Sequence, residues 1–152
     1  AGITVQGIDD VSVRFAKCCS PIPGDEIVGF VTRGRGVTIH RTDCINMINL
    51  PEEERARLID AEWQREAEIG NKGLYLAEII IYGHNRTGLL VDITKILTER
   101  KIDMISVNSR TSKQGMATIT MSFEVPDKSV LNYLIEKIRQ VESVIDIERT
   151  TG

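Results

Sequence analysis

The clearest hydrophobic pattern lies in the second half of the chain. Residues 76–82 are almost all apolar, as expected of a strand in the middle of a covered sheet. In residues 116–125, apolar side chains alternate with Thr, Ser and Glu, which is typical of a strand with one buried face. Residues 102–111 and 144–148 also have strand-like composition. The pattern therefore predicts four strands in this half.

Two amphipathic helices are predicted between these strands. The first follows a turn at 85–88, with Thr87 as its cap, and the second begins after Pro126. The order βαββαβ predicts a ferredoxin-like fold, in which both helices cover one face of a four-stranded antiparallel sheet. The other face and the edges of such a sheet remain open, so we expect a homodimer or another docked partner. Apolar residues of the two helices are Leu89, Ile93, Ile96 and Leu97, and Val130, Leu131, Leu134, Ile135 and Ile138.

The first half has shorter elements. Residues 11–15 alternate as a half-buried strand that leads to Cys18, and residues 27–32 and 37–40 form a predicted hairpin around a glycine-flanked turn. Thr42 is expected to cap a short helix that ends before Pro51.

An edge strand at 58–63 follows, and its Trp63 is expected to anchor a small core. Glycines 70 and 73 mark the predicted domain boundary. We therefore predict an α+β protein, with a small β-rich domain at 1–70, including an N-terminal tail, and a ferredoxin-like domain at 74–150.

Composition narrows the class of protein. Of the 152 residues, 41% are hydrophobic and 27% are charged, which is the balance of a soluble globular protein. No apolar run is long enough to cross a membrane, and the N-terminus lacks a signal-peptide pattern, so we expect a cytoplasmic protein with no membrane partner. The net charge of −3 excludes a protein that coats nucleic acid with its whole surface, but not a locally basic site.

All three cysteines and one of the two histidines lie between positions 18 and 44. Cys18 and Cys19 are adjacent, and His40 and Cys44 flank the junction between a predicted strand and helix. Thiol and imidazole donors of this kind bind zinc, provided that the chain turns sharply at the adjacent pair. The alternatives are buried thiols without metal and, with less support, a Cys-His nucleophile, which would need an orienting group and a cleft.

Two further sets of residues have a functional and a purely structural interpretation. Basic residues surround the cysteines, and they are either solvated surface or contacts to RNA phosphates. The loop from 84 to 89 directs helix amides outward and is either an empty loop or a site for the carboxylate of an amino acid. The two sets are Arg14, Lys17, Arg33, Arg35 and Arg41, and His84, Asn85, Arg86, Thr87, Gly88 and Leu89.

Both halves resemble the C-terminal region of the long RelA/SpoT-family (p)ppGpp synthetase/hydrolases of the bacterial stringent response. The sequence VRFAKCCSPIPGDEIVGFVTRGRGVTIHRTDCIN resembles the zinc-finger domain of this family, also called the ribosome-intersubunit domain. The sequence GHNRTGLLVDIT resembles the ACT-domain signature, with Asn85 where the family usually has Asp.

The resemblance implies a zinc-binding set of Cys18, Cys19, His40 and Cys44. It also implies a regulatory segment that docks on ribosomal RNA with A-site tRNA nearby, and that controls the catalytic domains of its parent enzyme. An alternative function is an ACT sensor and dimerisation module that binds a branched-chain amino acid. The hydrolase, synthetase and TGS motifs of the family are not found in these residues, so we do not expect this fragment to be an enzyme.

Overall fold

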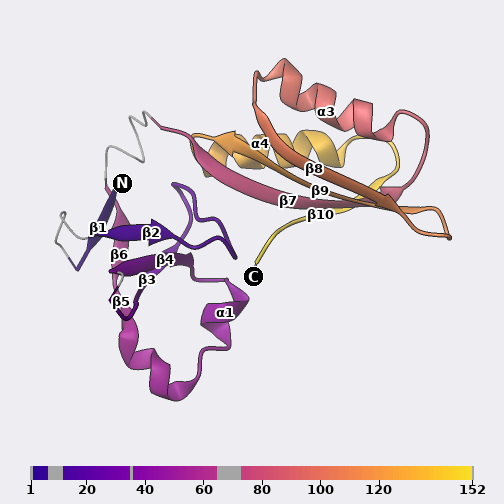
Figure 1. Ribbon diagram of the computed structural model, residues 1–152. Coiled ribbons are helices and arrows are strands. Elements are labelled where there is room, and N and C mark those ends of the chain that lie inside the picture. Colours follow the sequence, from indigo (N-terminus) through magenta and orange to yellow (C-terminus); the bar gives the residue numbers. More distant parts are fainter. Residues whose placement is uncertain (1, 7–11, 35, 65–72, 152) are drawn as a thin grey trace. The chain divides into compact units, whose positions relative to one another are not determined.

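The computed structural model describes residues 2–6, 12–34, 36–64 and 73–151. The chain separates into two compact units, Ala1–Gly73 with Thr151–Gly152, and Leu74–Thr150 (Figure 1). Of the two glycines at the predicted domain boundary, Gly73 lies among the described residues, whereas Gly70 lies outside them. Within the described ranges, no helix combines the length and apolar character that a membrane crossing requires.

The second unit is a four-stranded antiparallel sheet in the order β10-β7-β9-β8. Helices α3 and α4 lie on one face of this sheet (Figure 1). The predicted ferredoxin-like order is therefore confirmed. The elements are β7 (Tyr75–His84), α3 (Leu89–Glu99), β8 (Met104–Thr111), β9 (Met116–Val125), α4 (Lys128–Arg139) and β10 (Val144–Arg149).

The core of this unit lies between the sheet and the helices. Alternate residues of β7 and β9 point toward the helices and are almost completely buried, as the period of two predicts. The helices meet them with Ile93 and Leu97 from α3 and with Leu131, Leu134 and Ile138 from α4.

One predicted cap differs from the structure. Gly88, not Thr87, is the N-cap of α3, and its backbone has a φ of 84°, so no side chain caps this helix. The left-handed conformation, which glycine adopts without a steric penalty, makes the turn there.

Asp127 caps α4 through its side chain. Its Oδ1 accepts hydrogen bonds from the amide of Val130 at 3.0 Å and the hydroxyl of Ser129 at 2.6 Å. Partial burial acts to raise the pKa of Asp127, but these hydrogen bonds outweigh it and hold the pKa below its usual value. A carboxyl group with a lowered pKa stabilises the fold above its unfolded-state pKa, and this stabilisation is lost as pH falls through the folded-state pKa.

We therefore expect Asp127→Ala to lower the free energy of unfolding of the second unit by about 1 kcal/mol near neutral pH. The difference from wild type should begin to shrink below about pH 4, the unfolded-state pKa of an aspartate, and should vanish once the pH is below the lowered folded-state pKa, where the wild-type carboxylate is protonated. Urea unfolding at several pH values measures this. Asp127→Asn is the matched control, because asparagine also caps helices well; a pH-independent deficit in Asp127→Ala would contradict the expected linkage.

The first unit is built on a mixed sheet in the order β2-β4-β3-β5. The predicted hairpin is present, with β3 (Ile27–Val31) antiparallel to β4 (Val37–Arg41). The strand β2 (Val13–Phe15) runs parallel to β4, while Val11, included in the predicted strand, lies outside the described residues. Gly36 has a φ of 76°, and a Cβ there would lie 2.5 Å from the carbonyl oxygen of Ser12, so glycine is needed where the turn meets β2.

The remaining elements depart from the prediction. Residues 58–63 do not form one strand, because β5 (Leu58–Ile59) pairs with β3 and β6 (Ala61–Trp63) pairs with β1 (Ile3–Val5) in a separate two-stranded sheet. The strand β1 lies where we expected only a tail. The charged run before β5 forms a short 3-10 helix, η1 (Glu52–Arg57).

Trp63 anchors the first unit as predicted. Its side chain is buried and stacks on Phe15, with the ring centroids 5.7 Å apart. Its indole N–H donates to the carbonyl oxygen of Asp25 at 3.0 Å, and Asp25 Oδ2 in turn accepts from the amide of Ile22 at 2.8 Å. These contacts fix the proline-containing loop that follows the cysteines.

Candidate metal centre

A sharp turn brings the adjacent cysteines to the same side of the chain. Residues 17–19 form a turn after β2, and the amide of Ser20 donates to the carbonyl oxygen of Ala16 at 3.0 Å. Ser20 has a φ of 47°, an uncommon conformation for a residue other than glycine. In a regular strand, Cys18 and Cys19 would point to opposite faces, so this turn supplies the bend that metal binding requires.

The other two donors come from the end of β4 and the start of α1 (Ile45–Ile48). His40 is the penultimate residue of β4, and Cys44 is the N-cap of α1. The amide of Cys44 donates to the carbonyl oxygen of Arg41 at 3.1 Å, which closes the turn between the two donors. Thr42 does not cap the helix as predicted, because its hydroxyl donates to Glu26 Oε1 at 2.8 Å instead.

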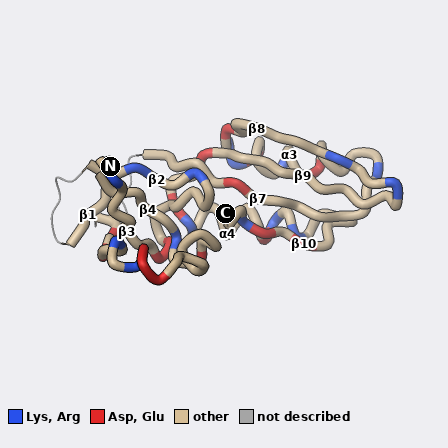
Figure 2. The backbone as a smooth tube through the Cα atoms, turned by 60° about the horizontal axis from the view of Figure 1, so that its bottom comes forward, with Lys and Arg blue, Asp and Glu red and all other residues tan. Residues whose placement is uncertain are grey.

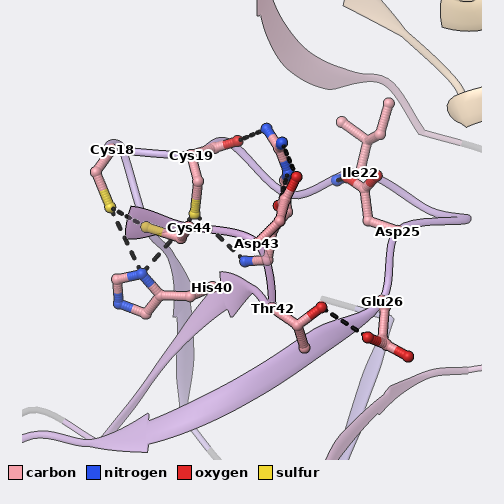
Figure 3. Close-up of polar contacts among 10 residues, drawn as sticks. Cys18, Cys19, Ile22, Asp25, Glu26, His40, Thr42, Asp43 and Cys44 are labelled. Atoms are coloured by element: carbon pink, nitrogen blue, oxygen red, sulfur yellow. Dashed lines mark hydrogen bonds and ion pairs between the residues drawn. The ribbon is translucent and has the colours of Figure 1, made fainter. Parts of the chain in front are cut away.

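The four donor atoms converge on one point (Figure 3). The sulfur of Cys18 lies 3.5 Å from the sulfur of Cys44 and 3.5 Å from Nδ1 of His40, and the sulfur of Cys19 lies 3.8 Å from the same nitrogen. All four atoms lie within 4.8 Å of one another. A tetrahedral zinc ion bound at the usual distances would separate such donors by about 3.5–3.8 Å.

The donor set therefore fits zinc, in the closed Cys3His arrangement that is typical of structural sites. The ion would be held by the three sulfurs and by Nδ1 of the histidine, and it would link the turn after β2 to the end of β4. The three cysteines are part of an apolar cluster. Its other members are Ala16, Val28, Met47, Leu50 and Leu58.

Burial changes the pKa values of these groups. It raises the pKa of the Cys19 thiol to about 12, and the neighbouring thiols act in the same direction, while the amide of Arg41 acts against the change. Burial also raises the pKa of Cys44 and lowers that of His40. Without metal, Cys19 and Cys44 are therefore neutral thiols and His40 is a neutral imidazole near pH 7. This opposes the thiol-nucleophile interpretation, because the thiolate is the reactive form.

The predicted RNA-contacting residues lie in different environments. Arg14 on β2, Lys17 in the turn after it and Arg33 in the hairpin turn are exposed. Arg35 lies outside the described residues. Arg41 is only 4% exposed, and its guanidinium forms an ion pair with Asp43 at 2.7 Å, so it is not displayed on the surface with the other three.

The predicted ligand loop of the second unit leads from β7 into α3. Leu89 is buried in the core, whereas His84, Asn85, Thr87 and Gly88 are exposed. The guanidinium of Arg86 donates to the carbonyl oxygen of Glu142 at 3.0 Å and to Asp92 Oδ2 at 2.9 Å. Arg86 therefore ties the loop to the turn before β10, and a ligand would contact mainly the four exposed residues.

Two residues that hold the segments of the candidate metal centre were not predicted from the sequence. Asp43 pairs with Arg41, and Asp25 holds the loop after the cysteines, but neither was a candidate. The only sequence signal was that Arg41 and Asp43 both lie between His40 and Cys44.

Each of the two units matches a known protein family. A family model described as the RelA/SpoT RIS domain matches residues 3–64, and a model of the ACT domain matches residues 71–149. Among solved structures, the ACT domain from GTP pyrophosphokinase of Chlorobium tepidum has a TM-score of 0.46 and 26% identity, and the match covers 51% of this chain and 99% of that chain.

Similar full-length proteins include the GTP pyrophosphokinase of Escherichia coli strain K12, which is 40% identical over 151 residues. The bifunctional (p)ppGpp synthase/hydrolase RelA of Mycobacterium tuberculosis is 37% identical over 151 residues. Each match covers 99% of this chain but 20% of the relative, so the chain spans about a fifth of their length. Because both domain models and these relatives agree, the chain belongs to the RelA/SpoT family, as a C-terminal region in which a RIS domain is followed by an ACT domain.

Proposed function

We propose that this chain is the ribosome-docking regulatory segment of a cytoplasmic (p)ppGpp synthetase/hydrolase. In this proposal, zinc holds the RIS domain together, and its basic surface binds ribosomal RNA close to A-site tRNA. Docking then controls the catalytic domains of the parent protein. The relatives named as GTP pyrophosphokinase and as (p)ppGpp synthase/hydrolase support this assignment of the parent.

The observation that carries the proposal is the separation of charge across the RIS domain. The strand β2, with Arg14 and the following Lys17, forms one edge of the sheet, and the turn with Arg33 packs beside its start, where Gly36 contacts Ser12. The opposite edge is β5, preceded by the acidic η1. Figure 2 colours the basic positions of the chain blue and the acidic positions red. A polyanion would therefore be attracted to the β2 edge and repelled from the η1 edge.

The basic residues at the β2 edge are also available for a partner. Among the described residues, none forms an ion pair with Arg14, Lys17 or Arg33. In contrast, Arg55 and Arg57 of η1 are paired with glutamates of the same helix. Unpaired arginine and lysine side chains can neutralise phosphates and release the counterions bound to them.

We expect the triple variant Arg14→Glu, Lys17→Glu and Arg33→Glu to bind ribosomes about a hundredfold more weakly at low salt. The slope of log affinity against log salt concentration should fall by about three, one for each lost phosphate contact. Sedimentation with purified ribosomes in a salt titration measures both. Arg55→Glu, at the η1 edge, is the matched control; equal losses in the two variants, or none in the triple variant, would contradict the proposal.

A second candidate function, dimerisation of the ACT domain, is favoured by the edge strand β8. All eight residues of β8 are exposed, including Met104, Ile105 and Val107 at 41%, 56% and 42%. Its only charged residue is Arg110, whereas the opposite edge strand β10 carries Asp146, Glu148 and Arg149. Long edge strands with few charges pair readily with another strand, so β8 is the better edge for a second copy.

We therefore expect the chain to sediment as a dimer and Val107→Lys to shift it toward monomer by at least tenfold in dissociation constant, because a charge would be placed in the interface. Ile145→Lys on β10 is the matched control and should have no such effect. Analytical ultracentrifugation with and without millimolar valine, leucine or isoleucine also tests the amino-acid sensor, which predicts a tighter dimer with ligand. A monomer in all conditions would exclude this second function.

A further inference from the structure

Arg41 contacts both the turn that carries Cys18 and Cys19 and the segment that carries Cys44. Its backbone amide donates to the sulfur of Cys19 at 3.3 Å, and its Nη1 donates to the carbonyl oxygen of Cys19 at 3.0 Å. Its own carbonyl oxygen accepts from the amide of Cys44 at 3.1 Å. One residue therefore holds the turn with the paired cysteines, lies next to His40 in the chain, and orients the fourth donor.

Asp43 fixes the guanidinium of Arg41. Nε and Nη2 of the arginine donate to Oδ1 and Oδ2 of Asp43 at 2.9 and 2.7 Å, in a two-pronged ion pair. The carboxylate is 62% exposed while the arginine side chain is 5% exposed, so the charge pair extends from the surface to the buried cysteine turn. Figure 3 shows Asp43 beside Cys19 and Cys44.

A buried arginine has a large desolvation cost, which is offset only when its geometry is good and its donors are paired. Arginine also offers planar, forked donors that lysine cannot reproduce. Here the fork binds a carboxylate on one side and a main-chain carbonyl group next to a metal-binding sulfur on the other. Groups in such positions orient metal ligands, and their loss typically weakens metal binding about 10- to 100-fold.

We propose that Arg41, braced by Asp43, is the positioning residue of the metal centre and sets the placement of Cys19 relative to His40 and Cys44. This inference rests on the proposed zinc site. It assigns Arg41 a role inside the RIS domain, in place of a contact to RNA phosphate, for which its guanidinium would have to leave Asp43 and the Cys19 carbonyl group.

The test compares Arg41→Lys and Asp43→Asn with wild type by titration of Zn²⁺ against a chromophoric chelator. We expect Arg41→Lys to weaken zinc binding about 10- to 100-fold and Asp43→Asn to weaken it less, because Asp43 acts only through the arginine. Arg14→Lys is the matched control for loss of an arginine elsewhere in the domain and should leave the affinity unchanged.

A second readout separates positioning from a general loss of stability. With Co²⁺ at saturation, the d–d absorption bands report the ligand geometry, and we expect Arg41→Lys to change their positions or intensities. Val5→Ala destabilises the same domain at the buried strand β1, outside the apolar cluster that contains the metal donors, and should leave the saturated spectrum as in wild type.

The outcomes distinguish this inference from the proposed function. If wild type binds neither Zn²⁺ nor Co²⁺, the proposal of a zinc site is wrong, and so is the proposed role of Arg41. If wild type binds zinc but Arg41→Lys binds it within twofold and gives the same cobalt spectrum, only the positioning role is overturned. If Val5→Ala and Arg41→Lys weaken zinc binding equally and leave the cobalt spectrum unchanged, Arg41 only stabilises the domain and has no positioning role.

Discussion

Removal of zinc will unfold the RIS domain while the ACT domain stays folded. A domain of this size has a small core, and structural zinc sites commonly supply about 10–16 kcal/mol of apparent binding energy that is coupled to folding. Protein purified without chelator should contain about one zinc per chain. Addition of EDTA should lower the melting temperature of the RIS domain by about 20 °C or abolish its transition.

The matched variants for this prediction are Cys44→Ser and Thr42→Ala. Cys44→Ser removes a donor and should lose zinc, whereas Thr42→Ala removes only the exposed hydrogen bond to Glu26 and should retain it. Elemental analysis and differential scanning calorimetry measure both quantities. Protein that carries no metal and is insensitive to EDTA would instead support the interpretation of buried thiols, which the apolar surroundings of the cysteines also allow.

Truncation of Phe123 will destabilise the ACT domain strongly and leave the zinc content unchanged. Phe123 is fully buried on β9, opposite Ala77 on β7 and Met104 on β8. Phe123→Ala should lower the free energy of unfolding of this domain by about 3–5 kcal/mol, from lost burial and the cavity left behind.

Thr120→Ala, on the other face of the same strand, should cost well under 1 kcal/mol and serves as the control. Urea unfolding followed by circular dichroism gives the stability, and the zinc-to-protein ratio gives the independent reading for the RIS domain. A loss near 1 kcal/mol for Phe123→Ala would show that the site collapses around the smaller side chain. Loss of zinc in this variant would show that the two domains depend on each other for folding.

Local patterns were sufficient for most elements of the ACT domain. Alternation of apolar residues placed β9 at 116–125, the bounds that the structure has, and Pro126-Asp127 marked the start of α4. These features depend on residues close together in sequence, so they can be read without the fold. Where the prediction of a cap failed, at Thr87, a left-handed glycine one residue later made the turn instead.

Long-range pairing was not predictable in the RIS domain. Ile3 pairs with Trp63, sixty positions along the chain, and the strand at 58–63 divides between two sheets. A three-residue strand carries too little periodicity to indicate its partner, because pairing depends on which edges the rest of the domain leaves open. The same holds for the parallel pairing of β2 with β4, which brings Cys18 and Cys19 beside His40.

The cysteines and the histidine of the candidate metal centre could be identified without the fold, because the chemistry of these side chains is local. Their convergence depends on the fold, through the turn at Ser20 and the pairing of β2 with β4. The exposure of the arginines also depends on the fold. Arg14 and Arg33 are exposed, while Arg41 is buried against Asp43 and Cys19. A charged side chain has no local signal for burial, since its environment is made by neighbours that folding brings to it.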